Sequence, residues 1–452
     1  MNVLLNDTTM PRLSVSSRVE RLPKSSYQTF LCWLLIIAWF VEAIDLGGIA
    51  YLMPVLAKAF NLDPKTLGYL GAISFAGMFV GSIISGNLSD RFGRKKILMA
   101  SMAFWGIAGV LLSMAWSIES LFVFRFLLGL GLGAQVPIGI TMLSELIPSK
   151  IRGKYLALYQ AFLPVGITAA GLITYLVLPK FGWQGVFFVE ALPALWLFVI
   201  WKYMPESPRW LESKSKFVEA DKIIGDIEKK VQKSTGGDLP PVEVLTESDH
   251  DKGPRNKGFG ELATKAFLPV VVMAAIWQGS TMLGFYGLNT WLSALLVAKG
   301  FSVIKSIGFV SLIALGGLPA YFLVSYLAEK IGRKWNAAFF MIMTGIGAYI
   351  WGSATSFVFV IILGLIFQFF YYGMAMANNV YLPELWPTHL RGTGVGFGLS
   401  CGRIGALIGP ILLGFVMATY GPMAVFAVAA GILVLGGVAI IVLGPETKGK
   451  VF

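Results

Sequence analysis

The sequence predicts an all-α membrane protein in which twelve transmembrane helices form two halves of six. Hydrophobic residues make up 56% of the 452 positions and charged residues only 13%, whereas soluble proteins carry about a quarter charged residues. The hydrophobic residues gather in runs long enough to cross a bilayer, which takes about 20 residues of helix. Two charged motifs also occur twice at one spacing, which indicates a duplicated unit.

The repeated motifs lie in polar connections between the apolar runs. The segment 86–96, GNLSDRFGRKK, recurs in weaker form as the segment 325–334, SYLAEKIGRK. The segment 145–153, ELIPSKIRG, recurs as the segment 384–392, ELWPTHLRG. Both pairs are offset by 239 residues (329 minus 90, and 384 minus 145). A shared offset places the two motifs at matching positions of two related halves.

Twelve apolar runs are predicted to span the membrane. Only helices or closed barrels satisfy the backbone in lipid, and the short alternating strands of a barrel are absent from the sequence. The expected spans are residues 29–57, 67–88, 97–116, 120–143, 155–178, 185–203, 267–297, 302–328, 336–354, 356–381, 391–419 and 422–444. They divide the chain into a tail (1–28), a six-helix bundle (29–203), a central loop (204–266), a second bundle (267–444) and a second tail (445–452).

The distribution of Lys and Arg predicts the orientation in the membrane. Of the 36 such residues, only five fall in connections on the side opposite the N-terminus, namely Lys58, Lys65, Lys180, Lys299 and Lys305. Basic residues collect on the cytoplasmic side, so both termini and the central loop are expected in the cytoplasm. The protein itself is expected in the inner membrane. Within the central loop, residues 217–233 are predicted to form an amphipathic helix, and residues 234–257 to be flexible.

Composition also argues against several functions. The net charge of +12 lies in short loops and not on a soluble basic face, so nucleic acid is not an expected partner. Cys32 and Cys401 fall inside apolar runs, and His250 and His389 fall in polar connections. These spacings match no metal site, and neither metal nor cofactor is expected. No phosphate-binding loop is present, and no nucleophile, base and orienting residue group together, so an enzyme is not expected.

Several motifs resemble the major facilitator superfamily. These are the segments 86–96 and 145–153, the pattern R-x-x-x-G-x-G-x-G that begins at Arg125, and the segments 205–209 (PESPR) and 445–449 (PETKG). The last two resemble its sugar-porter and organic-ion branches, and the whole resembles bacterial niacin or aromatic-acid transporters of the organic-ion and synaptic-vesicle-like branch. The resemblance implies a secondary transporter that works by alternating access between two bundles.

The repeated loop motifs are candidates for a cytoplasmic gate. Arg94 is expected to pair with Glu145, and Arg333 with Glu384, when the site faces outward. Asp90 is expected to accept from backbone N–H groups at a neighbouring helix N-terminus. The alternative is that such loops only satisfy the positive-inside rule, which we favour for Lys95, Lys96 and Lys334. The predicted gate residues are Asp90, Arg94, Glu145, Arg152, Glu329, Arg333, Glu384 and Arg391.

Ionisable residues inside spans indicate a coupling site, because each costs about 3 kcal/mol or more at the bilayer centre. Asp45 in the first span lies where similar family members place an acid, and Arg125 lies where they place its partner. Release of this pair would let the acid take a proton. Glu42 shares a helical face with Asp45 and would share its field. The alternative is a static ion pair that fixes the first and fourth spans. Glu190 is expected near the outer interface, in a structural role.

Arg403 is the residue that indicates the substrate. It lies about a dozen residues into the span 391–419, and the pattern R-x-G-x-x-x-x-P up to Pro410 resembles organic-anion transporters, in which this arginine faces the central cavity. A guanidinium offers a planar fork that matches a carboxylate. The alternative is that Arg403 pairs with a buried acid, Asp45 or Glu42.

Other cavity candidates are polar or aromatic residues at span depth. They are Trp39, Gln135, Gln160, Gln278, Tyr286, Asn289, Trp291, Gln368, Tyr371, Tyr372, Asn378 and Asn379. A sugar porter would show paired glutamines where only Gln278 stands, and a tryptophan near Asn378. Aromatic rings with a few amides and one arginine suit a flat aromatic carboxylate.

The expected function is proton-coupled import of a small organic anion, such as nicotinate or a benzoate, by a monomer that uses the proton gradient in place of a cofactor. The alternative is a sugar or polyol symporter. Drug efflux and a non-transporting sensor on the same fold are weaker alternatives.

Overall fold

The computed structural model describes residues 13–242, 258–387 and 390–448. Residues 1–12 of the first tail, 449–452 of the second tail, and both histidines lie outside the described residues. The second part of the expected flexible segment, residues 243–257, also lies outside them, so that expectation is not tested. Within the described residues the secondary structure is helical, as the sequence predicts.

The first half contains six spans. They are formed by α2 (Ser26–Ala59), α3 (Pro64–Phe92), α4 (Arg94–Ser113), α5 (Ile118–Leu146), the long helix α6 (Ser149–Ala191), and the end of α6 continued by η1 (Leu192–Leu195) and α7 (Trp196–Tyr203). Helix α6 covers two spans because the chain bends at Gly182, whose φ of 64° is accessible to glycine without strain. Side chains cap the starts of the helices, as where Asp63 accepts from the Thr66 N–H at 3.1 Å.

The second half repeats this order. Its spans are α11 (Leu268–Ala298), α12 (Val303–Ala314) continued by η3 (Leu315–Gly317) and α13 (Leu318–Ile331), α14 (Arg333–Ser353), α15 (Phe357–Glu384), α16 (Arg391–Tyr420) and α17 (Pro422–Leu443). Length and hydropathy mark ten candidate spans in the described residues, with Ser149–Tyr203 counted as one and α14 not counted. Division of that long stretch at Gly182 and addition of α14 give the twelve spans that the sequence predicts.

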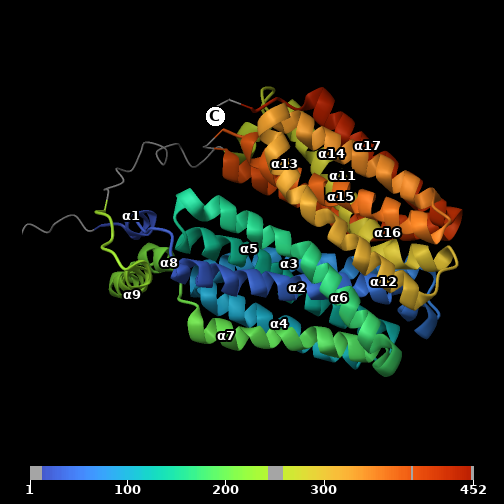
Figure 1. Cartoon of the computed structure of the whole chain (residues 1–452), viewed down its shortest axis with the longest axis horizontal. Coiled ribbons are helices and arrows are strands. Elements are labelled where there is room, and N and C mark those ends of the chain that lie inside the picture. Colours follow the sequence, from blue (N-terminus) through green and yellow to red (C-terminus); the bar gives the residue numbers. More distant parts are fainter. Residues whose placement is uncertain (1–12, 243–257, 388–389, 449–452) are drawn as a thin grey trace, which may run out of the picture.

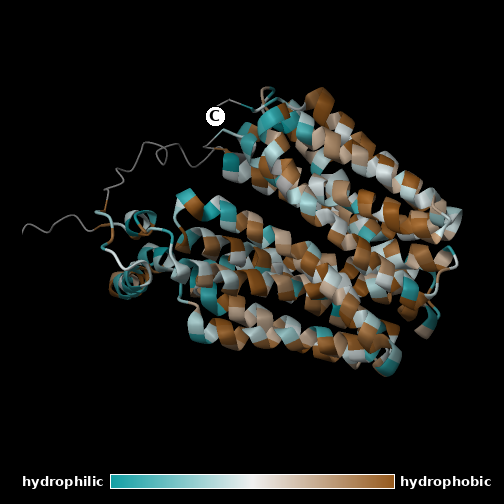
Figure 2. Cartoon of the chain, in the orientation of Figure 1, coloured by the Kyte–Doolittle hydropathy of each residue, from teal (hydrophilic) through white to brown (hydrophobic). Residues whose placement is uncertain are grey.

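Glycines bring helices together within each half. A Cβ on Gly77 of α3 would touch the backbone of α5 at Leu130, 2.8 Å from its nitrogen. In the second half, a Cβ on Gly409 of α16 would lie 3.1 Å from the Cα of Gly287 on α11. Lipid supplies no hydrophobic drive for helix association, so such close backbone approach is a main source of packing energy. Figure 2 shows the apolar residues along the spans and the polar residues gathered toward the helix ends.

The two halves meet at one end of the molecule and diverge toward the other, where α1, α8 and α9 lie (Figure 1). At the meeting end, α3 packs on α16: a Cβ on Gly68 would lie 2.7 Å from the Pro410 carbonyl oxygen, and the Lys65 ammonium lies 4.7 Å from the centre of the Phe415 ring. At the diverging end, no ion pair between described residues joins the halves. Access to the interior is therefore from the α9 end, which the distribution of basic residues predicts to be cytoplasmic.

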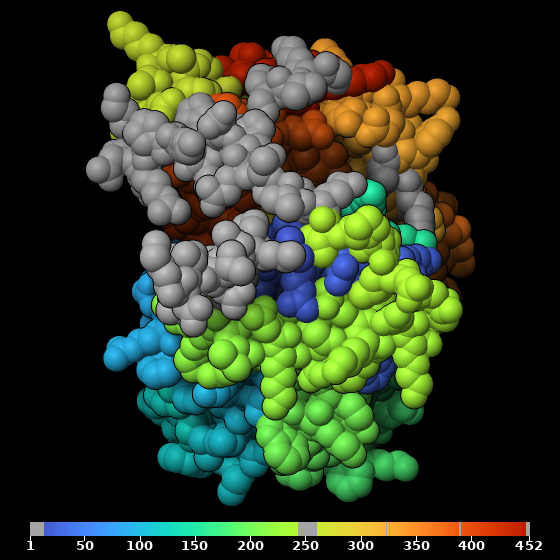
Figure 3. Space-filling view, turned by 90° about the vertical axis from the view of Figure 1, so that its left-hand side faces the viewer, coloured from blue at the N-terminus to red at the C-terminus, as the bar shows by residue number. Residues whose placement is uncertain are grey.

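Short helices cover the diverging end of the first half (Figure 3). They are α1 (Val15–Glu20), α8 (Pro208–Ser213) and α9 (Phe217–Thr235). A further short helix, α10 (Gly258–Leu262), lies at the end of the central loop, before the second half. Helix α9 confirms the predicted amphipathic helix. It buries Ala220, Ile224, Ile227 and Val231.

Ion pairs hold α9 against the first tail. The Glu228 carboxylate lies 2.5 Å from Arg18 and 2.7 Å from Arg21. Burial opposes ionisation of Glu228, but the hydrogen bonds and charges of the two arginines outweigh burial and hold the pKa of this carboxyl below its ordinary value of 4.5.

Candidate functional site

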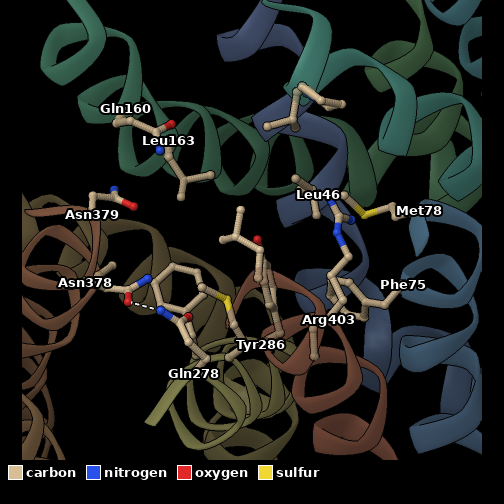
Figure 4. A pocket seen from close by; sticks show the side chains of 18 of the residues that line it. Leu46, Phe75, Met78, Gln160, Leu163, Gln278, Tyr286, Asn378, Asn379 and Arg403 are labelled. Carbon is tan, nitrogen blue, oxygen red and sulfur yellow. Dashed lines mark hydrogen bonds between the residues drawn. The ribbon is translucent and has the colours of Figure 1, made fainter. Parts of the chain in front are cut away.

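A cavity of about 340 Å³ lies between the two halves (Figure 4). Helices α2, α3, α5 and α6 form one side, and α11, α13, α15 and α16 form the other. It is lined by Trp39, Leu46, Phe75, Met78, Val136, Pro137, Ile140, Gln160, Leu163, Gln278, Met282, Phe285, Tyr286, Tyr321, Ala375, Asn378, Asn379, Leu399, Gly402, Arg403 and Ala406. The wall is mainly apolar with a few polar groups, and the volume lies in the range of small-molecule sites.

Among the described residues that line this wall, Arg403 is the one cation. Figure 4 shows its side chain extending across from α16 toward Leu46 and Met78 of the first half. Among the described residues, no carboxylate lies within 4.0 Å of its guanidinium. The alternative expectation, an ion pair between Arg403 and Asp45 or Glu42, is not met as a direct contact in this conformation, although the charges of Glu42 and Arg403 act on each other. The fork of N–H groups is left available to an anion in the cavity.

Aromatic rings form the flat parts of the wall. The Tyr286 ring of α11 lies 4.6 Å from the Phe75 ring of α3, so this contact joins the two halves beside the cavity. Behind them, Phe285 stacks on Tyr371 with ring centres 4.3 Å apart. Trp39 stacks on Tyr159 at 5.5 Å. Such rings offer faces and edges that suit a planar ligand.

Four amides complete the polar part of the wall: Gln160, Gln278, Asn378 and Asn379. Gln278 Nε2 donates a hydrogen bond to Asn378 Oδ1, which joins α11 to α15. Figure 4 shows Tyr286 between this amide pair and Arg403.

Several predicted cavity residues face elsewhere. The Gln135 amide donates to the Ala38 carbonyl at 2.7 Å and accepts from Trp105 Nε1 at 3.0 Å. Trp291 Nε1 donates to the Pro410 carbonyl at 3.1 Å. Asn289 is buried outside the cavity wall. The remaining three, Gln368, Tyr371 and Tyr372, are also buried outside it. These residues pack helices together and do not line the cavity.

Among the described residues, the spans of the first half bury four charged side chains. Glu42, Asp45, Arg125 and Glu190 are each 2% exposed or less. The expected ion pair between Asp45 and Arg125 is not formed within 4.0 Å, and Arg125 Nε and Nη1 have no hydrogen-bond partner. The charges of Asp45 and Glu190 nevertheless act on Arg125, and those of Arg403 and Asp45 act on Glu42.

Glu190 is fully buried, and neither carboxylate oxygen has a hydrogen-bond partner. A buried carboxylate does not extend to the interface, and the structural role expected for Glu190 stays a prediction. Its carboxylate lies against Gly48 of α2, where any Cβ would overlap it. The sequence signal for a buried acid of this kind is a single acidic residue inside an apolar run, as Glu190 is in the span 185–203.

The repeated loop motifs form matching clusters in the two halves. Arg94 lies 2.9 Å from Asp90 and 3.6 Å from Glu145. Arg333 lies 2.7 Å from Glu329 and 3.1 Å from Glu384. Arg152 pairs with Glu20 of the first tail at 3.0 Å. Arg391 is exposed. Each cluster lies within one half. Both pairs are formed although the halves are apart at this end, whereas they were expected when the site faces outward.

The glutamates of the PESPR and PETKG motifs accept hydrogen bonds at the N-termini of helices, a role that was predicted for Asp90. Glu206 accepts from the Lys95 N–H at 3.0 Å, at the start of α4. Glu446 accepts from the Arg333 N–H at 2.9 Å, at the start of α14. The prediction for Asp90 is wrong, because that side chain pairs with Arg94 one turn away on the other side of the loop. Glutamate at a helix N-terminus satisfies unpaired N–H groups and the helix dipole.

Twelve spans in two related halves around one central cavity define a multi-pass membrane transporter. Two overlapping stretches, residues 35–397 and 307–451, match the family described as the Major Facilitator Superfamily. The chain belongs to this superfamily. Its members are transporters and not enzymes, and among the described residues no group of His, Cys, Asp and Glu could hold a metal ion.

Two members of this superfamily and one solved structure are similar to the chain over most of its length. The chain is 32% identical to the niacin transporter NiaP of Acinetobacter baylyi, over 97% of this chain and 98% of that protein. It is 28% identical to the 4-hydroxybenzoate transporter PcaK of the same organism, over 89% and 88% of the two chains. Among solved structures, it is similar to a partially occluded inward-open form of the xylose transporter XylE from E. coli, with a TM-score of 0.74 and 18% identity over 93% of this chain and 100% of that one. The last likeness concerns the fold alone.

Proposed function

We propose that this transporter imports a small aromatic monocarboxylate, such as nicotinate or a benzoate, together with protons. The observation that carries the proposal is the unpaired Arg403 guanidinium in a cavity wall built mainly from aromatic and aliphatic side chains. A partly buried cation with no ion pair within 4.0 Å is costly at span depth, and a ligand carboxylate would lower that cost with charge-assisted hydrogen bonds. The names of the relatives that transport niacin and 4-hydroxybenzoate support the same class of substrate.

The substrate ring would lie against Tyr286 and Phe75, whose rings tilt toward each other across the two halves. A ligand at this contact touches both halves at once. Movement of the halves would therefore change its surroundings, which is the requirement for alternating access. The clusters around Arg94 and Arg333 would form the gate at the expected cytoplasmic end.

Proton coupling is assigned to the buried charges of the first half. Asp45 is the proposed proton carrier, with Glu42 beside it and Arg125 as the cation that responds to its charge. Glu190 joins this group because its charge also acts on Arg125. When Arg125 approaches Asp45, the ionised acid is stabilised; when they separate, as here, a proton on the acid relieves the cost of an isolated charge.

The alternative of a sugar or polyol symporter has one supporting observation, the four amides in the cavity wall. Uptake of labelled nicotinate and labelled benzoate into proteoliposomes, under an inward proton gradient, separates the two. Unlabelled benzoates, hexoses and choline would be the competitors. Competition by carboxylates alone supports the proposal. Competition by hexoses alone contradicts it and leaves Arg403 a structural residue.

A further inference from the structure

The hydrogen-bonding groups of the Gln278 and Asn378 amide pair are not all used within the protein. One N–H of Gln278 Nε2 donates to Asn378 Oδ1. Gln278 Oε1, in contrast, is buried and has no hydrogen-bond partner. The side chain is 0% exposed and belongs to the cavity wall. A buried carbonyl oxygen without a donor carries a desolvation cost that a ligand donor can remove.

The surroundings hold Gln278 in this position. A Cβ on Gly398 would lie 3.4 Å from Gln278 Cγ, and a Cβ on Gly402 would lie 3.6 Å from Gln278 Oε1. Helix α16 therefore lies within van der Waals reach of the Gln278 side chain on one side, and Asn378 of α15 accepts a hydrogen bond from it on another. The amide is therefore held beside Gly402 of α16, the residue that precedes Arg403 in the sequence.

The amide pair and Arg403 offer different chemistry to a ligand. Arg403 has only N–H donors and suits a carboxylate. Gln278 Oε1 is an acceptor and suits an O–H or N–H group. Figure 4 shows Tyr286 between the two, so a ring against Tyr286 would have its carboxylate at one side and its other substituent at the amide pair.

We propose that Gln278, held by Asn378, is a specificity-determining residue that selects aromatic carboxylates with a hydrogen-bond donor on the ring, such as a hydroxyl or amino group. The inference rests on the proposed function and narrows its substrate class. A ring hydroxyl donates to Gln278 Oε1, an unsubstituted ring leaves that oxygen unpaired, and a ring nitrogen without hydrogen meets it as a second acceptor. One neutral hydrogen bond formed in competition with water corresponds to an affinity difference of about tenfold.

The test is equilibrium binding to the purified full-length protein in lipid nanodiscs. The probes are benzoate, 3- and 4-hydroxybenzoate, and nicotinate. At least one hydroxybenzoate should bind about tenfold more tightly than benzoate, and nicotinate should bind no more tightly than benzoate. Gln278→Met should remove the advantage of the hydroxybenzoate and leave benzoate binding in place.

Gln368→Met is the matched control. Gln368 is also a buried glutamine with an unpartnered Oε1, but it does not line the cavity, so its replacement should leave the ratio unchanged. Asn378→Ala provides a second variant: it releases Gln278 Nε2 as a donor, and nicotinate should then gain relative to benzoate.

An unchanged ratio in a folded Gln278→Met protein, or a wild-type preference for nicotinate that Gln278→Met removes, would overturn the inference. Failure of the proposed function looks different, because then none of the four carboxylates would bind the wild-type protein. Binding of all four with equal affinity and dependence on Arg403 would reject the role of Gln278 alone.

Discussion

The Glu190 carboxylate on α6 lies directly against Gly48 on α2, in the space that a β-carbon would occupy. Gly48 lies one turn after Asp45 on α2, the helix that also carries Glu42. The contact therefore brings the buried Glu190 carboxylate of α6 close to this acidic part of α2. A side chain at position 48 must displace this acid or separate the two helices.

Gly48→Ala is therefore expected to destabilise the protein by roughly 1–3 kcal/mol, the usual cost of overpacking. Thermal unfolding of the purified protein measures the effect. The double variant Gly48→Ala with Glu190→Ala removes the overlapping carboxylate and should recover part of the loss, since residues in contact are coupled. Additive losses in the double variant would show that the contact does not exist.

Asp45→Asn is expected to abolish proton-driven accumulation and to retain exchange of labelled for unlabelled substrate, because an amide cannot carry the proton. Both rates are measured in proteoliposomes. Asp226→Asn, at an exposed position on α9, is the control and should behave as wild type. Normal accumulation by the Asp45 variant would remove this residue from the coupling site.

Gly68→Val tests the contact that closes the end remote from α9. A Cβ at this position would lie 2.7 Å from the Pro410 carbonyl oxygen, so the larger side chain should separate α3 from α16. Distances between spin labels at the exposed ends of these helices should lengthen. The same change at Gly431 of α17, which has no atom within 4 Å of a built Cβ, should have no effect. Equal distances in both variants would contradict the closure described here.

The attachment of α9 should depend on pH through Glu228. Its pKa is lower in the folded protein than the ordinary 4.5, so the ion pairs with Arg18 and Arg21 stabilise the attachment fully above that ordinary value. The stabilisation is lost as the pH falls through the lowered folded value. Hydrogen exchange of α9 amides should be constant from neutral pH down to about 4.5, after correction for intrinsic rates, and protection should fall only under more acidic conditions. Loss of protection near pH 6 would show that Glu228 does not hold the helix.

Hydropathy and motif spacing were sufficient to predict the spans and their duplication, because bilayer thickness and backbone satisfaction leave few alternatives. Helix α9 was predictable from its period. The break between the fifth and sixth spans was predicted at residues 179–184, and the chain does bend there, at Gly182. Hydropathy did not show that helix α6 would continue on both sides of this bend.

The cavity was predictable only in part. Arg403, Gln278 and Tyr286 lie in its wall, but Gln135 and Trp291, chosen on the same grounds, bond to neighbouring helices. Residue type and depth do not say which face of a helix a side chain occupies, and spans that are buried on most sides have no clear polar face. The pairing of Glu20 with Arg152 joins segments far apart in the chain, and no local pattern indicates it.

The most direct test of the account is binding of labelled benzoate to the wild-type protein and to Arg403→Ala and Arg403→Lys. Loss of charge-assisted hydrogen bonds should weaken binding by about 10- to 100-fold in the alanine variant. Lysine, which keeps the charge without the planar fork, should give an intermediate affinity. Unfolding temperatures close to wild type would show that the variants are folded. Equal affinities in wild type and Arg403→Ala would contradict the assignment of Arg403 as the carboxylate site, and with it the proposed substrate class.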